Sequence, residues 1–327
     1  MTIENQIINI LKSDPEVSIS DLLQKIQVSR QMIHRVINKM LQENYIEKIG
    51  KPPKVFYRLA SQQITPKSTD INLNNDELEM LNEHFLTITE MGQKLQGVEA
   101  LQFWANRQKL PIEKTAKEFI TTRQKYLKYF SSEGLINGIE KLKSTKSLGN
   151  ISIDEMYYLD FYAIERFGKT KLGTLLHFAK QGQNQKLMYE IISMTKEKIN
   201  ELIRNKKIDA VGYIPPTIKR HLQFMHVLQK GYNFSLPHLN ILKVTGDIPV
   251  PQKALSKIED RIINARSSIV VREAREFNNV LLIDDAVGSG ATINETATKL
   301  KIKGTAQKVV GVAITGSFKG FEVIQEI

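Results

Sequence analysis

Residues 280 to 292 read VLLIDDAVGSGAT, and this stretch decides the fold of the C-terminal half of the chain. Its first four residues are apolar without polar alternation, which is typical of a strand buried on both faces. The run TINETA that begins at Thr292 predicts the start of a helix. A glycine turn between a strand and a helix gathers backbone N–H groups at the positive end of the helix dipole. The sequence therefore predicts an anion site, most naturally for a phosphate.

Two adjacent carboxylates, Asp284 and Asp285, come at the end of the predicted strand. Open α/β sheets bind their ligands at this carboxyl edge, and the two acids suit a ribose diol or a magnesium-bound group. A Walker-type P-loop is excluded, because no Lys follows the last glycine before the hydroxyl residue. The alternative is an ordinary buried strand followed by a solvent-exposed turn.

The pattern of apolar strand, two acids, two apolar residues, glycine turn and Thr resembles the phosphoribosyl-pyrophosphate motif of type I phosphoribosyltransferases. The resemblance implies that Asp284 and Asp285 hold the 2′- and 3′-hydroxyls of a ribose and are the catalytic pair if the domain is active. It also implies Mg²⁺ that arrives with phosphoribosyl pyrophosphate, without a direct metal ligand from the protein. The residues implied to cradle the 5′-phosphate are Gly288, Ser289, Gly290, Ala291 and Thr292.

A second stretch with a predicted ligand role lies upstream of the acids. Residues 208 to 214, IDAVGYI, predict a strand, and a proline-stiffened basic loop follows it. In type I phosphoribosyltransferases an early strand leads into a loop that holds pyrophosphate. The alternative is a turn followed by a basic helix start. The residues that the resemblance places in this loop are Pro215, Pro216, Thr217, Lys219 and Arg220.

The segment between these two stretches is similar to the ComF-like competence branch of the same family. The similarity extends over about residues 152 to 327 and depends on Gln252, Leu255, Arg261 and Asn264. Residues 221 to 226, HLQFMH, replace an Arg-Gly-Phe-Asn stretch that is usual in that branch. Gly288 stands where purine-salvage members carry an acid that acts as a base, so the resemblance does not imply hypoxanthine or guanine salvage.

The first 60 residues form a separate pattern. Apolar residues recur at helical spacing in three stretches, and the second and third are joined by a very short turn, as in helix-turn-helix units. Residues 46 to 59 read as strand, basic turn and strand, and resemble the wing of winged-helix DNA-binding domains. A winged helix that serves as a protein-docking module is the alternative. The residues expected to contact DNA are Ser29, Arg30, Gln31, His34, Arg35, Lys39, Lys51 and Lys54.

The remaining sequence divides the chain into domains. We expect a winged helix over 1–60, a polar linker over 61–75, a helical middle region over 76–150, and a phosphoribosyltransferase-like domain over 151–327. The last domain is expected to open with helices over the run from Tyr157 to Lys180 and to close with a parallel strand over 308–315. The predicted fold class is therefore multi-domain: a winged helix, a helical middle region, and an α/β domain with a mainly parallel sheet.

Composition restricts the class of protein. Lys and Arg exceed Asp and Glu by 11, which favours a polyanionic partner, and the absence of Cys excludes disulfides and thiol chemistry. The sequence contains neither a signal peptide nor an apolar run that could span a bilayer, so we expect a soluble cytoplasmic protein.

Three functions fit these features. The first is a DNA-binding regulator that senses phosphoribosyl pyrophosphate or a nucleotide, as purine repressors of some Gram-positive bacteria do with similar modules. The second is an active phosphoribosyltransferase or nucleotide-cleaving effector, similar in architecture to bacterial antiviral defence systems of the retron type. The third is an inert interaction scaffold, whose partner could dock on residues 76–150. Because winged helices read palindromic DNA in pairs, we expect a homodimer.

Overall fold

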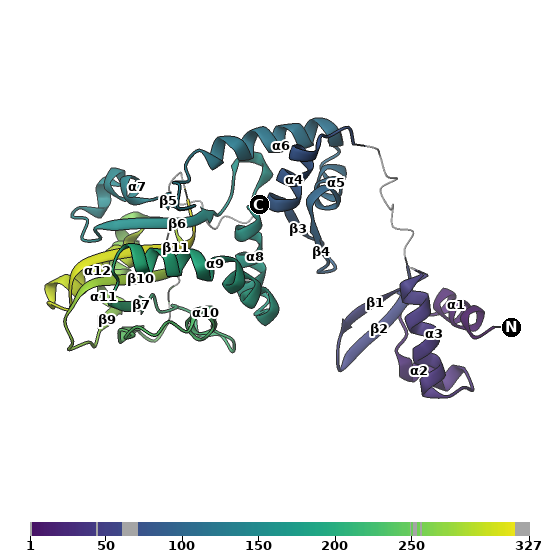
Figure 1. The fold of residues 1–327 in the computed structure, drawn as a ribbon. Coiled ribbons are helices and arrows are strands. Elements are labelled where there is room, and N and C mark those ends of the chain that lie inside the picture. The colour runs from purple at the N-terminus through teal and green to yellow at the C-terminus, as the bar shows by residue number, and fades with distance from the viewer. Residues whose placement is uncertain are drawn as a thin grey trace. The chain divides into compact units, whose positions relative to one another are not determined.

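The computed structural model describes residues 2–43, 45–60, 71–248, 250, 254–255 and 257–317. Most of the expected linker, residues 61 to 70, and also Gln252 lie outside the described residues. The chain divides into two compact units. Residues 1–72 with 89–93 form the first, and residues 73–88 with 94–327 form the second (Figure 1).

The first unit is a helix-turn-helix with a β-hairpin wing. Its helices share a core with the hairpin, in which Ile7, Leu22, Ile33 and Ile37 are fully or almost fully buried. Val17 bridges to Tyr57 of the hairpin and fastens the loop between the first two helices to the wing. The elements are α1 (Ile3–Ser13), α2 (Ile19–Lys25), α3 (Arg30–Gln42), β1 (Ile46–Lys51) and β2 (Lys54–Leu59).

Side-chain caps fix where these helices begin. Ser18 and Asp21 form a reciprocal capping box at the start of α2. Ser29 accepts a hydrogen bond from the backbone N–H of Met32 and so starts α3 only a few residues after α2 ends. Both caps satisfy N–H groups that a helix start leaves without an internal partner. The Ser29 cap therefore fixes one end of the short turn between α2 and α3 that the sequence predicts.

The second unit is built on a mixed, mainly parallel sheet. Within the described residues its strand order is β5-β6-β11-β10-β7, and β5 alone runs antiparallel to its neighbour. The strands are β5 (Ile136–Asn137), β6 (Glu155–Phe161), β7 (Ala210–Tyr213), β10 (Phe277–Val287) and β11 (Ala306–Gly316).

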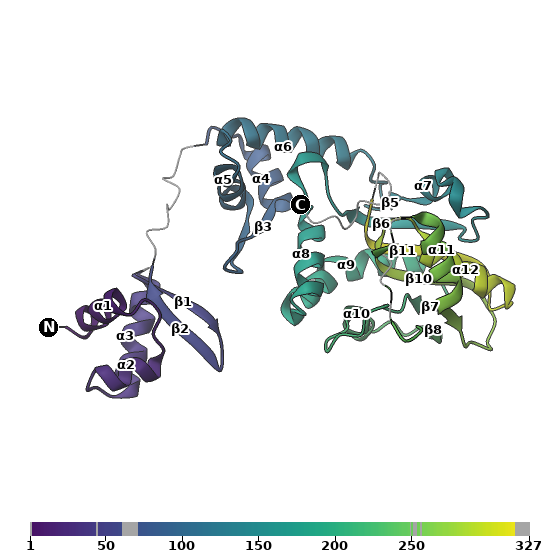
Figure 2. The ribbon, with the colours of Figure 1, turned by 180° about the vertical axis from the view of Figure 1, so that it is seen from behind.

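Helices cover both faces of this sheet. Successive residues of β10 alternate between the two cores: Val280 and Leu282 face one, and Leu281 and Ile283 face the other. α8 (Lys171–Gln181), α9 (Gln185–Asn205) and α10 (Phe224–Tyr232) pack on the second face. α11 (Ile258–Ser268) and α12 (Ala291–Ile302) pack on the first, as Figure 2 shows from behind. Burial on both faces explains why the strand sequence is apolar without alternation.

The helical region before the sheet shares the core of the sheet. Phe85 and Phe119 pack edge to face with ring centroids 4.7 Å apart, and Phe119 and Trp104 contact Phe167 at 5.3 and 5.5 Å. Residues 76–88 and 94–150 therefore fold in one compact unit with 151–327. The elements of this region are α4 (Asn75–His84), β3 (Leu86–Ile88), β4 (Lys94–Gln96), α5 (Gly97–Arg107), α6 (Ile112–Leu127), α7 (Ile139–Ser144) and a 3-10 turn at Lys146–Leu148.

One local prediction was wrong. The first part of the run from Tyr157 to Lys180 is not helical, because residues 155 to 161 form β6. Tyr158 and Leu159 of this strand are buried in opposite cores, so β6 is apolar on both faces and lacks the alternation that identifies a half-buried strand. Helix α8 begins only at Lys171, after a 3-10 turn at Glu165–Phe167 and the cap residue Thr170.

Two strand predictions and the helix after the glycine turn agree with the structure, whereas the region 76–150, expected to be helical, also contains β3, β4 and β5. The predicted strands over 208–214 and 308–315 correspond to β7 and β11, and the glycine turn leads into α12 as expected. A short antiparallel pair, β8 (Ile241–Lys243) and β9 (Ile269–Val271), lies between β7 and β10 in the chain. The predicted multi-domain class, with a winged helix, helical segments and a mainly parallel sheet, is confirmed.

In the parts of the chain that the structure describes, no helix is both long enough and apolar enough to cross a bilayer.

Candidate functional site

A cavity of about 240 Å³ lies at the carboxyl edge of the parallel strands in the second unit. The loop after β7, the end of β10 and the start of α12 contribute residues to its wall, as the sequence predicts. Helix α8 and strand β8 contribute others that the sequence analysis does not single out. The predicted residues that line the cavity are Asp284, Asp285, Thr292, Pro215, Pro216, Thr217 and Arg220.

The two acids lie at adjacent positions near the end of β10. The backbone N–H of Asp285 donates to Oδ1 of Asp284 at 2.8 Å, which orients the first carboxylate. Burial and the charge of Asp285 raise the pKa of Asp284, and the nearby ammonium groups of Lys180 and Lys243 partly oppose this rise. Asp284 thus takes up a proton more readily than an exposed aspartate, while still lining the cavity.

A lysine from helix α8 neutralises the second acid. Nζ of Lys180 lies 2.5 Å from Oδ2 of Asp285, and the two side chains are 31% and 18% exposed. The guanidinium of Arg220 donates to the backbone carbonyl of Lys180. The loop after β7 is therefore tied to the end of α8, directly beside the acid pair.

Lys243 and Tyr162 complete the polar wall. Burial lowers the pKa of Lys243, and the charge of Asp284 opposes that shift. Burial, followed by the charge of Asp285, raises the pKa of Tyr162 to about 12, so its hydroxyl stays protonated near neutral pH. This hydroxyl lies 3.3 Å from Nδ1 of His177, one turn before Lys180 on α8. The cavity thus offers cationic groups and a neutral hydroxyl donor around two carboxylates.

The glycine turn lies between β10 and α12. Gly290 has φ +78°, a left-handed conformation that glycine adopts without strain, and no side-chain hydrogen bond caps α12 there. The N–H of Ala291 points to Oγ of Ser289 at a long 3.4 Å. The N-terminus of α12 therefore presents N–H groups that an anion could accept. Of the predicted turn residues, Thr292 lines the cavity, whereas Gly288, Ser289, Gly290 and Ala291 are not in its wall.

Helix α7 packs against this turn. Nζ of Lys141 donates to the carbonyl of Gly288 at 2.7 Å, and burial lowers the pKa of Lys141 to about 8. A methyl group on Gly290 would come within 2.9 Å of the Leu142 side chain. The turn is thus held from one side by residues more than a hundred positions earlier in the chain.

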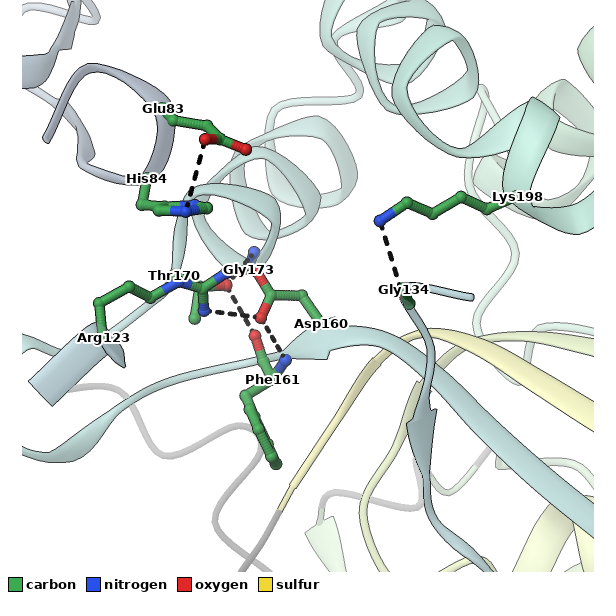
Figure 3. A network of polar contacts seen from close by, with 9 residues as sticks. All are labelled: Glu83, His84, Arg123, Gly134, Asp160, Phe161, Thr170, Gly173 and Lys198. Carbon is green, nitrogen blue, oxygen red and sulfur yellow. Dashed lines mark hydrogen bonds and ion pairs between the residues drawn. The ribbon is translucent and has the colours of Figure 1, made fainter. Parts of the chain in front are cut away.

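The end of β6 is anchored by a buried ion pair with α6. The guanidinium of Arg123 forms two hydrogen bonds, of 2.9 and 3.1 Å, with the carboxylate of Asp160. Asp160 also accepts from the N–H of Phe161, and the hydroxyl of Thr170 donates to the carbonyl of Phe161 (Figure 3). These bonds fix the loop that carries Tyr162 into the cavity wall.

His84 lies beside the same ion pair, as Figure 3 shows. Burial, followed by the charges of Arg123, Lys171 and Lys198, lowers its pKa to about 4. The carboxylate of Glu83 lies 3.7 Å from the ring but is two-thirds exposed. His84 is therefore neutral near pH 7.

The cavity does not fit a magnesium ion held by the protein. Mg²⁺ needs a near-octahedral shell of oxygen ligands, and of the described residues only Asp284 and Asp285 bring carboxylates to the wall, too few to hold the ion without ligand phosphates or water. One oxygen of Asp285 already contacts the ammonium of Lys180. Across the described residues, no three His, Cys, Asp or Glu side chains gather closely enough to hold a metal.

Lys219 of the predicted pyrophosphate loop is exposed and does not line the cavity, unlike its neighbour Arg220. Among the cavity residues, sequence reasoning missed Lys180, Lys243, Tyr162 and His177, which come from α8, β8 and the end of β6. The spacing of three residues places His177 and Lys180 on one face of a predicted helix, but it does not indicate that this face lies against Asp284 and Asp285.

On the first unit, the residues predicted to contact DNA are all exposed. Ser29 is the cap of α3, and Arg30 and Gln31 follow it in the first turn. Lys39 differs from the rest, because its ammonium pairs with Glu4 at 2.9 Å and so ties α3 to α1. Lys51 and Lys54 flank the tip of the wing. The N-terminal turn of α3 and the wing tip thus form the basic surface of this unit.

Comparison with known proteins gives three findings. No curated protein matches the chain. The crystal structure of a hypoxanthine phosphoribosyltransferase from Staphylococcus aureus is similar over 44% of this chain and 70% of that one, with 15% identity and a TM-score of 0.27. Residues 2–47 match the family model described as winged helix-turn-helix DNA-binding, so the first unit carries an N-terminal winged helix-turn-helix domain.

Proposed function

We propose that the protein is a DNA-binding regulator whose second unit binds a phosphoribosyl compound, either phosphoribosyl pyrophosphate or a nucleotide 5′-phosphate. The observation that carries the proposal is that Asp284, Asp285, Thr292 and Arg220 line one cavity at the carboxyl edge of a parallel sheet. These four residues come from two stretches that are separate in the sequence. These stretches lie side by side because β7 and β10 are hydrogen-bonded neighbours.

The cavity chemistry supports a sugar phosphate as the ligand. The two carboxylates can accept hydrogen bonds from vicinal hydroxyls, and the start of α12 offers N–H donors to a phosphate. Arg220, Lys180 and Lys243 add positive charge for further phosphoryl groups. The resemblance of this motif to type I phosphoribosyltransferases, and of the intervening segment to the ComF-like branch, supports the same ligand class.

DNA is the partner that the first unit favours. The family match, the exposed donors in the first turn of α3 and the basic wing tip support insertion of α3 into the major groove. Ligand binding would regulate DNA binding only if the ligand has different affinities for two arrangements of the protein. A homodimer that reads a palindromic site stays a prediction.

A second candidate function is phosphoribosyl transfer itself, as in an effector of a bacterial defence system. In this reaction a nitrogen nucleophile forms a bond to C1′ of the ribose while the bond from C1′ to the pyrophosphate oxygen breaks. The cations that line the cavity favour this candidate, since they could stabilise the charge of the departing pyrophosphate. Tyr162, with its raised pKa, could donate to that group but not act as a base near pH 7.

The experiment combines binding and turnover. Isothermal titration calorimetry with ribose 5-phosphate, phosphoribosyl pyrophosphate and nucleoside monophosphates should show uptake that is lost in the double variant Asp284→Asn/Asp285→Asn. Mass spectrometry after incubation with phosphoribosyl pyrophosphate and a panel of bases then separates the candidates. New products that require the two aspartates would establish the transferase, and ligand-dependent DNA affinity without products would establish the regulator. If none of these ligands binds, both candidates are wrong.

A further inference from the structure

Among the described residues, the cavity wall contains more positive than negative side chains, so cationic side chains are available to neutralise the acid pair. Lys180, Arg220 and Lys243 line the wall together with Asp284 and Asp285. A protein that binds a polar ligand with two adjacent carboxylates must provide a counter-charge, because like charges at short range raise each other's free energy. A divalent cation is one such counter-charge, and a lysine ammonium is another.

The structure places an ammonium at this position and holds it there. Nζ of Lys180 lies 2.5 Å from Oδ2 of Asp285, a contact shorter than the usual charge-assisted hydrogen bond between an ammonium and a carboxylate. Lys180 stands in the last turn of α8, where the helix dipole favours a cation. The bond from Arg220 to the Lys180 carbonyl also holds this turn. The ammonium is therefore positioned by the fold.

We propose that Lys180 is the built-in counter-ion of the acid pair, so that the ribosyl 5-phosphate part of a ligand binds without any divalent cation. An ammonium has three N–H donors, and Asp285 accepts one of them, which leaves donors for a ligand oxygen. Lys180 then acts as a ligand-binding residue as well as a counter-charge. This inference rests on the proposed function, since it concerns the same cavity. It differs from the expectation that Mg²⁺ accompanies the ligand, and limits any role of that ion to a pyrophosphate group.

Ribose 5-phosphate is the suitable probe, because it has no pyrophosphate group to bind Mg²⁺ by itself. Its dissociation constant is measured by calorimetry on the full chain, once in EDTA and once with excess Mg²⁺. The wild-type protein should give the same value in both buffers. The variant Lys180→Met, which keeps most of the length of the side chain but removes the charge, should bind about tenfold more weakly in EDTA than in Mg²⁺.

Two further variants separate a charge effect from a general loss of structure. Lys180→Arg keeps the positive charge and should remain independent of Mg²⁺. Lys186→Met, at an exposed position of the next helix and outside the cavity wall, should behave as the wild type.

The outcomes distinguish this inference from the proposed function. If the wild type binds ribose 5-phosphate only in Mg²⁺, the inference is wrong and the proposed function stands. Equal weakening of Lys180→Met in both buffers would also overturn it, because the lysine would then contact the ligand or support the fold without acting as a counter-ion that Mg²⁺ can replace. Absence of binding in either buffer would reject both the inference and the proposed function.

Discussion

At the scale of single residues, Asp284 combines a role in the site with a cost to the fold. Its carboxylate lies near the end of β10, directly after four buried apolar residues and beside a second acid, and its pKa is raised by burial and by that neighbour. A group with a raised pKa in the folded state contributes stability at low pH that is lost as the pH rises through that pKa. At neutral pH and above, the charged carboxylate of Asp284 therefore destabilises the fold that carries it.

We therefore expect Asp284→Asn to stabilise the protein and to weaken ligand binding. At pH 8 the melting temperature should rise by about 3 °C, the shift that roughly 1 kcal/mol produces in a domain of this size. The gain should shrink toward pH 4, because the wild-type carboxyl is then protonated. Thermal melts across this range measure the effect. Asp247→Asn, at an exposed position in the loop after β8, is the control and should show no such gain.

His84 predicts a pH dependence of opposite sign. Its folded-state pKa of about 4 lies below the ordinary value of 6.5, so the unfolded chain binds the extra proton between these values. Stability should be fully present above pH 6.5 and should fall as the pH drops toward 4. By this linkage the loss is about 2 kcal/mol between pH 8 and pH 5.

Urea unfolding of the wild type and of His84→Gln at pH 8, 6 and 5 measures this loss. The variant should lose less stability than the wild type over this range, because its amide does not titrate. Parallel curves for the two proteins would show that His84 does not stay neutral in the fold.

At the scale of elements, the site depends on how α7 meets the glycine turn. Gly290 combines a left-handed backbone with a side-chain neighbour, Leu142, at the place where a Cβ would point. Two separate constraints therefore act on this position. One is the backbone conformation, and the other is the space beneath α7.

Replacing Gly290 with Ala should cost more than a left-handed conformation alone. We expect a loss of about 2–3 kcal/mol for Gly290→Ala, the sum of roughly 1–2 kcal/mol for the backbone and a similar or smaller amount for the clash. Gly304→Ala is the matched control, because Gly304 has φ +71° with no atom within 4 Å of its Cβ position. Denaturant unfolding compares the two variants. In a Leu142→Ala background, which removes the clashing side chain, Gly290→Ala should cost less stability than in the wild type. Equal losses of unfolding free energy for both glycine variants would show that Leu142 moves aside without a measurable loss of stability.

The parts of the fold that can be predicted from the sequence are those whose residues are neighbours in the chain. The β10 strand, the glycine turn and the start of α12 lie within one stretch, so their order could be predicted directly from the sequence. The lysine that pairs with Asp285 lies 105 residues away and could not be found by spacing. Strand β6 was missed because an apolar run buried on both faces has no period that separates it from a buried helix. Which side chains converge on the cavity depends on strand order, which no local pattern contains.

At the scale of the whole molecule, the winged helix-turn-helix unit and the unit with the candidate cavity occur in one chain, so any coupling between the proposed DNA binding and the proposed ligand binding must be reciprocal. If a ribose phosphate changes the DNA affinity by some factor, DNA must change the ligand affinity by the same factor. This equality can be tested without knowledge of how the two units are arranged.

We expect saturating phosphoribosyl pyrophosphate to change the affinity for duplex DNA by about 5- to 150-fold, the usual range of allosteric coupling. Fluorescence anisotropy with labelled DNA measures one side of the cycle, and calorimetry on the DNA complex measures the other. Asp284→Asn/Asp285→Asn should retain DNA binding and lose the response to the ligand. A response that persists in this double variant would place the ligand elsewhere.

We expect the exposed residues of α3 to make the contacts to DNA. Arg30→Ala/Arg35→Ala should weaken binding and reduce the slope of log K against log salt by up to about 2, roughly one for each lost phosphate contact. Lys12→Ala, at an exposed position of α1 outside the predicted DNA surface, is the control and should leave the slope unchanged. Unchanged binding in the double arginine variant would favour a protein-docking role for the winged helix.

The buried pair of Arg123 and Asp160 limits how far this chain can be shortened from its N-terminus while the cavity stays intact. A fragment that starts at residue 151 would leave the carboxylate of Asp160 buried without its guanidinium, strip β5 from the sheet edge, and remove α7 from the glycine turn. Breaking such a pair typically costs about 3–5 kcal/mol, which is comparable to the entire stability of many domains. A fragment that begins at residue 73, where the second compact unit starts, keeps all three contacts, and the proposed ligand binding can be measured in it apart from DNA.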